Sequence, residues 1–145
     1  MKFVNSSILG AMMLASSLSN AASDQKQTVE DLWQKANIEF GIIKQLRSKI
    51  DENFDFLGSF GSEVEVKLCD FDLQPTLITP ESDFYLDLVE LADNRRIIRS
   101  LYKSKRACDK SSLDDQGTSE ACTEAETQVL RVISQFDVFV GFTIC

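Results

Sequence analysis

An amphipathic pattern from Thr79 to Cys108 predicts a central helix around which the chain is organised. It opens on Thr79-Pro80-Glu81-Ser82-Asp83, where a hydroxyl cap, a first-turn proline and early acids all favour a helix start. Apolar side chains then recur at three- and four-residue steps: Phe84, Leu88, Leu91, Ile98, Leu101 and Tyr102. A helix with such a face needs other elements to cover it.

A second helix is expected to begin near Thr28. The stretch Thr28-Val29-Glu30-Asp31 resembles a capping box with Asp in place of Glu. Helical spacing then continues through Leu32, Ala36, Phe40, Ile43, Leu46 and Ile50, and Gly58 and Gly61 mark the end. Four large apolar residues crowd that end, namely Phe54, Phe56, Leu57 and Phe60, and we expect them to form a core plug rather than an exposed aromatic patch.

The last helix is predicted to open at Thr118-Ser119-Glu120. Its broad apolar face comprises Cys122, Ala125, Val129, Val132, Ile133, Phe136, Phe139 and Val140. Because residues 138–145 are apolar almost throughout, we expect this end of the chain to be buried.

Residues 62–73 fit two patterns. Val64, Val66 and Leu68 alternate as in a strand, whereas Val64, Leu68 and Phe71 form one helical stripe. We favour a short helix, because a lone strand in a helical chain would leave its backbone groups unpaired. An extended connection between Pro75 and Pro80 is expected to follow.

The first 22 residues have the pattern of a secretory signal peptide. Lys2 gives a positive start, residues 8–18 are largely apolar, and Ser19-Asn20-Ala21-Ala22 is a small-residue cleavage region. Residues 23–145 are then a single domain by length. The fold class expected for it is all-α, a small disulfide-stabilised bundle of three long helices plus one short helix.

Four cysteines in a small secreted chain indicate two disulfides, with three connectivities to choose from. If Cys122 and Cys145 lie near the two ends of one helix, they are about 30 Å apart and cannot be bridged. Cys108 and Cys122 are neighbours in an antiparallel helix hairpin. The predicted disulfides are therefore Cys108–Cys122 and Cys69–Cys145.

The residue types present argue against catalysis. The chain has no histidine, and oxidised cysteines offer neither a nucleophile nor a metal site. A Gly-rich phosphate loop and a calcium loop are both absent from the sequence. The carboxylates of Glu81, Asp83, Asp87 and Glu90 are expected to be solvated charge on a helix face. We therefore predict a protein that is not an enzyme and needs no cofactor and no metal.

Charge segregates along the central helix. The chain has a net charge of −8, or −9 once Lys2 leaves with the signal, which disfavours nucleic acid and anionic membranes as partners. Yet seven of its 15 bases lie between Arg95 and Lys110, where Asp109 is the only acid. Five of them project within about 80° of one another on a helical wheel: Arg96, Arg99, Lys103, Arg106 and Lys110. These five residues, here called the basic face, are either a solvated surface or a contact for an acidic partner.

The mature chain resembles a family of small salivary proteins of anopheline mosquitoes, the anophensin and albicin type. The resemblance rests on the opening Ser23-Asp24-Gln25-Lys26-Gln27-Thr28-Val29-Glu30-Asp31-Leu32-Trp33, on the helical character, and on four cysteines of which the last is C-terminal. It implies a secreted salivary inhibitor of host defence. Albicin-like members inhibit the alternative complement pathway by binding its assembled convertase, and anophensin-like members block contact-phase (kallikrein–kinin) activation.

Three hypotheses about function follow. The first is a non-enzymatic inhibitor that binds the alternative-pathway complement convertase, a host plasma protein complex, by protein–protein contact. An inhibitor of contact-phase activation is the alternative within the same class. The third is a carrier of a small apolar ligand, because Phe-rich helices can line a cavity.

Overall fold

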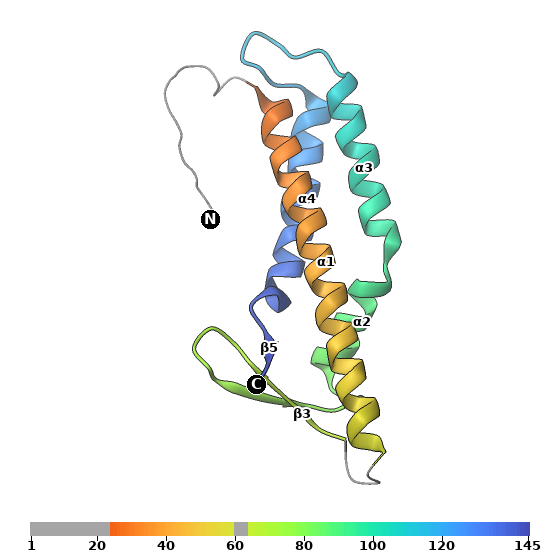
Figure 1. Ribbon diagram of the computed structural model, residues 1–145. Helices are drawn as coiled ribbons and strands as arrows, with labels where there is room; N and C mark the ends of the chain where they lie inside the picture. Colours follow the sequence, from red (N-terminus) through yellow and green to blue (C-terminus); the bar gives the residue numbers. More distant parts are fainter. Residues whose placement is uncertain (1–23, 60–63) are drawn as a thin grey trace.

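Helix α1 (Gln25–Gly58) is the longest element, and the other helices pack along it (Figure 1). The computed structural model describes residues 24–59 and 64–145. Helix α4 (Glu120–Val140) lies against α1 over much of its length, and α3 (Arg95–Lys110) packs on both. Helix α2 (Asp83–Asp93) covers the lower part of α1. The predicted signal peptide and Phe60 lie outside the described residues.

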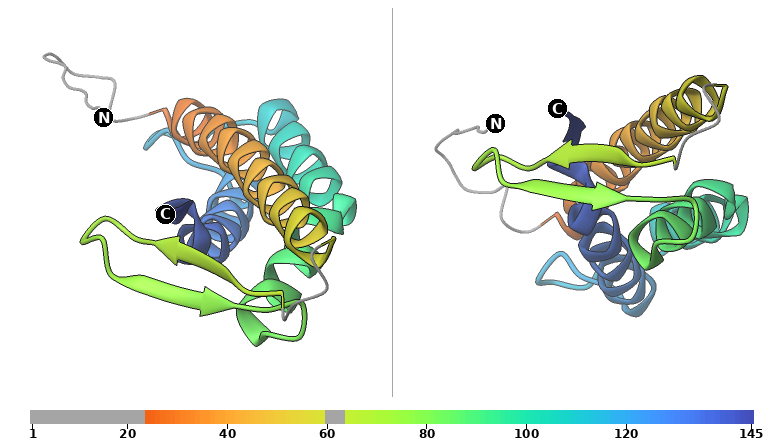
Figure 2. Two further views of the ribbon diagram at one scale, coloured as in Figure 1. Left: turned by 60° about the horizontal axis from the view of Figure 1, so that its bottom comes forward. Right: turned by 90° about the horizontal axis from the view of Figure 1, so that it is seen from below.

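The chain is mostly helical, as predicted, but the all-α expectation is wrong in one respect. A three-stranded antiparallel sheet with the order β4-β3-β5 closes one end of the bundle (Figures 1 and 2). Its strands are β3 (Val66–Cys69), β4 (Pro75–Ile78) and β5 (Thr143–Ile144). Leu68 is opposite Thr76 on one side and Ile144 on the other.

The short helix predicted for residues 62–73 is therefore wrong where the structure describes this segment. The alternation of Val66 and Leu68 was the correct signal, because both side chains are buried while Lys67 between them is exposed. Partners for the strand come from the extended segment after Pro75 and from the C-terminal residues. These two pairings satisfy the backbone groups that seemed to rule a strand out.

The single central helix predicted from Thr79 to Cys108 is two helices. Asn94 separates them, with φ −89° and ψ 80°, outside the helical region. The helical region also begins later than expected: Ser82 is the N-cap of α2, and its hydroxyl accepts a hydrogen bond from the N–H of Thr79 at 2.8 Å. The apolar pattern continues through the break, which is why periodicity alone did not reveal it.

The flanking helices match their predictions more closely. Helix α1 ends at Gly58 as expected but begins at Gln25 instead of Thr28, because the Asp24 carboxylate accepts the Lys26 N–H at 3.0 Å. Helix α4 opens at Thr118-Ser119-Glu120 as predicted, and Ser119 is its N-cap, with the hydroxyl accepting the N–H of Cys122 at 3.0 Å. Both helices thus start where a side chain satisfies an unpaired backbone donor.

Apolar faces of α1 and α4 form the main core. Phe136 of α4 is fully buried, and its ring centre lies 5.9 Å from that of Phe40 on α1. The expected core plug at the end of α1 holds only in part, since Phe54 is buried but Phe56 is exposed. Burial of residues 138–145 is also only partial: Phe139 is buried, whereas Val138 is 60% exposed.

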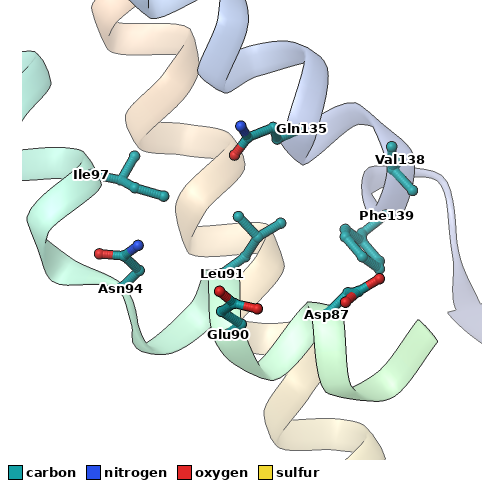
Figure 3. A pocket seen from close by; sticks show the side chains of 8 residues that line it. All are labelled: Asp87, Glu90, Leu91, Asn94, Ile97, Gln135, Val138 and Phe139. Carbon is teal, nitrogen blue, oxygen red and sulfur yellow. The ribbon is translucent and has the colours of Figure 1, made fainter. Parts of the chain in front are cut away.

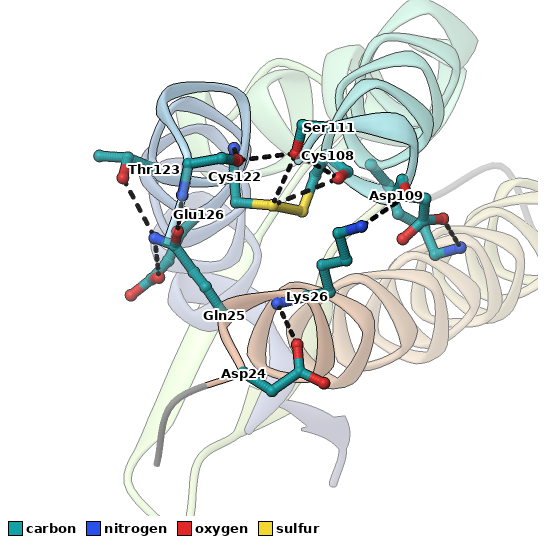
Figure 4. The surroundings of a disulfide bond; sticks show 11 residues. Asp24, Gln25, Lys26, Cys108, Asp109, Ser111, Cys122, Thr123 and Glu126 are labelled. Atoms are coloured by element: carbon teal, nitrogen blue, oxygen red, sulfur yellow. Dashed lines mark hydrogen bonds and ion pairs between the residues drawn. A yellow bond between two sulfur atoms is a disulfide. The ribbon is translucent and has the colours of Figure 1, made fainter. Parts of the chain in front are cut away.

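The two disulfides join the predicted pairs and lie at opposite ends of the bundle. Cys69–Cys145 ties β3 to the C-terminal residue, with the Cα atoms 5.4 Å apart. Cys108–Cys122 joins α3 to α4, and both cysteines are fully buried. At this end the start of α1 is also fixed, because the Gln25 side chain bonds Thr123 and Glu126 of α4 and the Lys26 ammonium donates to the Asp109 carbonyl (Figure 4).

Glu39 is the one charged residue buried among the described side chains, and it predicts a dependence of stability on pH. Burial, reinforced by a hydrogen bond to the carboxyl group of Asp137, raises the pKa of Glu39 from 4.5 to about 8. The folded state therefore holds a proton that the unfolded state has lost between these two values. The contribution of Glu39 to the free energy of unfolding should be fully present below pH 4.5. It should fall as pH rises towards 8, by up to about 1.4 kcal/mol per pH unit.

Urea unfolding of the wild type and of Glu39→Gln between pH 4 and pH 9 measures this effect. The Gln variant should lose the slope and become the more stable protein at pH 8, because its amide stays neutral. Asp137→Asn is the control for the neighbouring carboxyl and should shorten the pH range over which stability falls without abolishing the fall, since desolvation is the larger cause. Parallel pH profiles for the wild type and Glu39→Gln would contradict the assignment.

Candidate contact surface on helix α3

The basic face lies on the solvent side of α3. Leu101 and Cys108 are buried on the opposite side of the helix, which fixes how α3 is rotated against the bundle. All five residues of the basic face are exposed. The structure therefore places the sequence-predicted contact residues together on one accessible surface.

Hydrogen bonds to α4 hold α3 in this orientation. The Gln128 amide donates to the Ser100 hydroxyl at 2.8 Å, and the Gln128 oxygen accepts from the Ser104 hydroxyl. Because Ser100 and Ser104 lie one turn apart, a single glutamine fixes two positions of α3. The disulfide from Cys108 fixes the far end. The basic face thus belongs to a rigid part of the molecule.

The positive charges of this face are not consumed by internal ion pairs. Within residues 24–59 and 64–145, none of the five forms an ion pair. Lys105, on the α1 side of the same helix, behaves differently and contacts Glu30 and Asp109, each at 2.9 Å. Hydrogen bonding to Lys105 lowers the pKa of Glu30, and the same contact raises the pKa of Lys105. The structure therefore separates one structural lysine from five bases available to a partner.

An aromatic pair borders the basic face, and the sequence pattern predicted neither residue there. Tyr102, expected on the apolar face of its helix, is 43% exposed. The Arg106 guanidinium lies 5.7 Å from the centre of its ring. Trp33 of α1 packs beside Tyr102, with ring centres 6.0 Å apart, and the Lys105 ammonium lies 4.9 Å from the Trp33 ring. Tyrosine and arginine side by side are the residue types that dominate the energy of protein interfaces.

Two grooves bear on the carrier hypothesis. The larger, about 360 Å³, is open to solvent and lies where α2, α3 and α4 meet (Figure 3). Carboxylates of Asp87 and Glu90 stand among its apolar side chains, so a purely apolar ligand would desolvate charge there. The second, about 280 Å³, lies between α1 and the C-terminal strand, with Ile42, Leu46, Val140, Phe142 and Ile144 among its lining residues. Its volume is just below the roughly 300–1,000 Å³ usual for ligand sites.

Comparison with known proteins supplies no further assignment. Searches of protein-family models, of curated proteins and of solved structures find no match for this chain. Among the described residues, no cluster of three or more His, Cys, Asp or Glu side chains is arranged to hold a metal ion. No helix in the described part of the chain is long and apolar enough to cross a membrane.

Proposed function

We propose that this protein is a secreted, non-enzymatic inhibitor that docks the basic face of α3 onto an acidic surface of the alternative-pathway complement convertase. The observation that carries the proposal is a row of five exposed bases that form no ion pair with the described part of the chain, on a protein of net charge −8. An isolated cluster of this kind gives complementarity to an acidic partner and speeds its encounter.

The rigidity of the surface supports an inhibitor that acts by contact. Helix α3 is fixed by a disulfide at one end and by Gln128 along its length, so few degrees of freedom are lost on binding. Tyr102 and Arg106 supply the anchor type found at the centre of tight interfaces. The resemblance to salivary inhibitors is the reason for choosing the convertase as the target. Inhibition of contact-phase activation is the alternative, and a plasma kallikrein assay distinguishes the two.

Removing three arginines of the basic face should weaken target binding. Arg96→Ala/Arg99→Ala/Arg106→Ala is expected to raise the Kd for the assembled convertase at least tenfold, about 1.4 kcal/mol. Each substitution removes a guanidinium that would pair with an acidic group of the partner. Surface plasmon resonance at two salt concentrations measures the effect. The loss should shrink at high salt, where the wild-type contact is itself screened.

The matched control removes the same charge elsewhere. Lys49→Ala/Lys67→Ala/Arg131→Ala deletes three exposed bases outside α3 and should bind like the wild type within about twofold. Equal losses for both triple variants would mean that net charge, and not the basic face, governs binding. Unchanged affinity of the α3 variant at low salt would refute the assignment of the site.

The carrier alternative is favoured by the groove between α1 and β5, the more enclosed of the two. Native mass spectrometry of secreted protein, with decanoate as added probe, tests it. A stoichiometric adduct lost in Leu46→Gln would support a carrier, and an unliganded spectrum at excess decanoate would remove this alternative.

A further inference from the structure

The turn between β3 and β4, residues 70–74, exposes two large apolar side chains. Phe71 is 87% exposed and Leu73 is 77% exposed. Side chains of this size lose favourable burial when an ordered turn displays them together, so their position is not explained by folding. We propose that this turn, here called the hairpin tip, inserts Phe71 and Leu73 into an apolar pocket with a basic rim on a protein partner.

The hairpin tip is held in one conformation before any partner is bound. The Asp70 carboxylate accepts the N–H groups of Asp72 and Gln74 at 2.9 and 3.0 Å. The Asp70 carbonyl accepts the N–H of Leu73 at 3.0 Å. The preceding residue, Cys69, is disulfide-bonded to Cys145. A turn fixed by these contacts loses little conformational entropy when it docks.

Leu73 occupies a backbone conformation that favours glycine. Its φ is 58°, in the left-handed region, and among the described non-glycine residues it alone has a positive φ. Glycine would relieve the contact between Cβ and the backbone at this position, so leucine is unfavourable for folding here. Strain of this kind concentrates at functional positions. The leucine side chain therefore has a role outside the fold.

Phe71 rests on the end of α4 and remains largely exposed. A Cβ atom added at Gly141 would lie 2.5 Å from Cε2 of the Phe71 ring. Glycine at this position thus provides the space in which the ring lies. Because φ of Gly141 is −84°, the position tolerates alanine in its backbone, and Gly141→Ala would displace the ring without straining the helix end.

Charge identifies the kind of partner. Asp72 lies between the two apolar residues in the sequence and is exposed, and Asp70 precedes them. Acids beside the apolar pair match a pocket rimmed by Lys or Arg and disfavour an anionic membrane surface. The hairpin tip also projects away from α3 (Figures 1 and 2). It is therefore a second contact surface, with a charge opposite to that of the basic face.

Binding to immobilised alternative-pathway convertase is the first test, and this choice of probe rests on the proposed function. Phe71→Ser/Leu73→Ser should raise the Kd at least tenfold, and Gly141→Ala should raise it about threefold by moving the Phe71 ring. Leu86→Ser/Leu130→Ser is the matched control, because it removes two exposed leucines elsewhere and should bind like the wild type. Equal thermal midpoints for all variants would show that folding is intact.

The outcomes separate the two proposals. Convertase binding by the wild type with no loss in the hairpin variant overturns the hairpin proposal and leaves the proposed function standing. No binding by the wild type overturns the proposed function. The hairpin proposal is then tested on proteins that the immobilised wild type retains from serum: each is purified, and its binding to the wild type and to the variants is measured. Loss of such a protein in the hairpin variant but not in the control supports the proposal. The proposal is overturned if the wild type and the hairpin variant retain the serum protein equally, or if the wild type retains no serum protein. It is also overturned if the wild type binds phosphatidylcholine vesicles in place of a protein.

Discussion

Replacing Cys69 and Cys145 with serine is expected to lower the free energy of unfolding by about 4.5 kcal/mol. The disulfide spans 76 residues of sequence, so it removes a large amount of loop-closure entropy from the unfolded chain. Cys69 is only half-buried and Cys145 is exposed, so the serine hydroxyls are not forced into the core. Urea unfolding followed by circular dichroism measures the change.

The second disulfide provides the comparison. Cys108–Cys122 spans 14 residues and should contribute about 3 kcal/mol by the same entropy argument. Both of its cysteines are fully buried, so Cys108→Ala/Cys122→Ala is the appropriate variant. An unfolding midpoint unchanged by loss of Cys69–Cys145 would show that the sheet end of the bundle is not held by that disulfide.

Phe136→Ala is expected to lower the free energy of unfolding by about 3–5 kcal/mol. Phe136 is 0% exposed and packs on Phe40 at the α1–α4 interface, so alanine leaves a cavity that two long helices cannot readily close. The loss combines the transfer free energy of the ring with the cost of that cavity. Equilibrium denaturation of the variant and the wild type at the same pH keeps the Glu39 contribution equal in both.

Val138→Ala is the control for this substitution, two residues further along α4. Its side chain is 60% exposed, so truncation should change stability by no more than about 0.5 kcal/mol. A loss under about 1 kcal/mol for Phe136→Ala would mean that the α1–α4 interface is not the centre of the core.

Local signals in the sequence predicted the long helices and the cysteine pairing. Gly58 is the last residue of α1, where Ser59 forms the C-cap, and Ser119 caps α4 by accepting a backbone N–H. The pairing followed from helix length, which keeps Cys122 far from the chain end. Asn94 also carried a signal, since asparagine is common where helices end, but the apolar spacing across it concealed the break.

Contacts between distant segments could not be predicted in the same way. Strand β3 is stable because residues 75–78 and 143–144 pair with it, and nothing local indicates either pairing. The basic face was visible as a periodicity of charge, whereas its border was not, because only the structure brings Trp33 of α1 beside Tyr102 of α3. The hairpin tip escaped prediction for the same reason as its strands.

An alternative-pathway haemolysis assay tests most directly whether this protein inhibits the convertase through α3. The wild type should suppress lysis at micromolar concentration, and Arg96→Ala/Arg99→Ala/Arg106→Ala should need at least about ten times more protein for the same effect. The Lys49→Ala/Lys67→Ala/Arg131→Ala variant should match the wild type. Full lysis in the presence of micromolar wild-type protein, or equal inhibition by both triple variants and the wild type, would contradict this account.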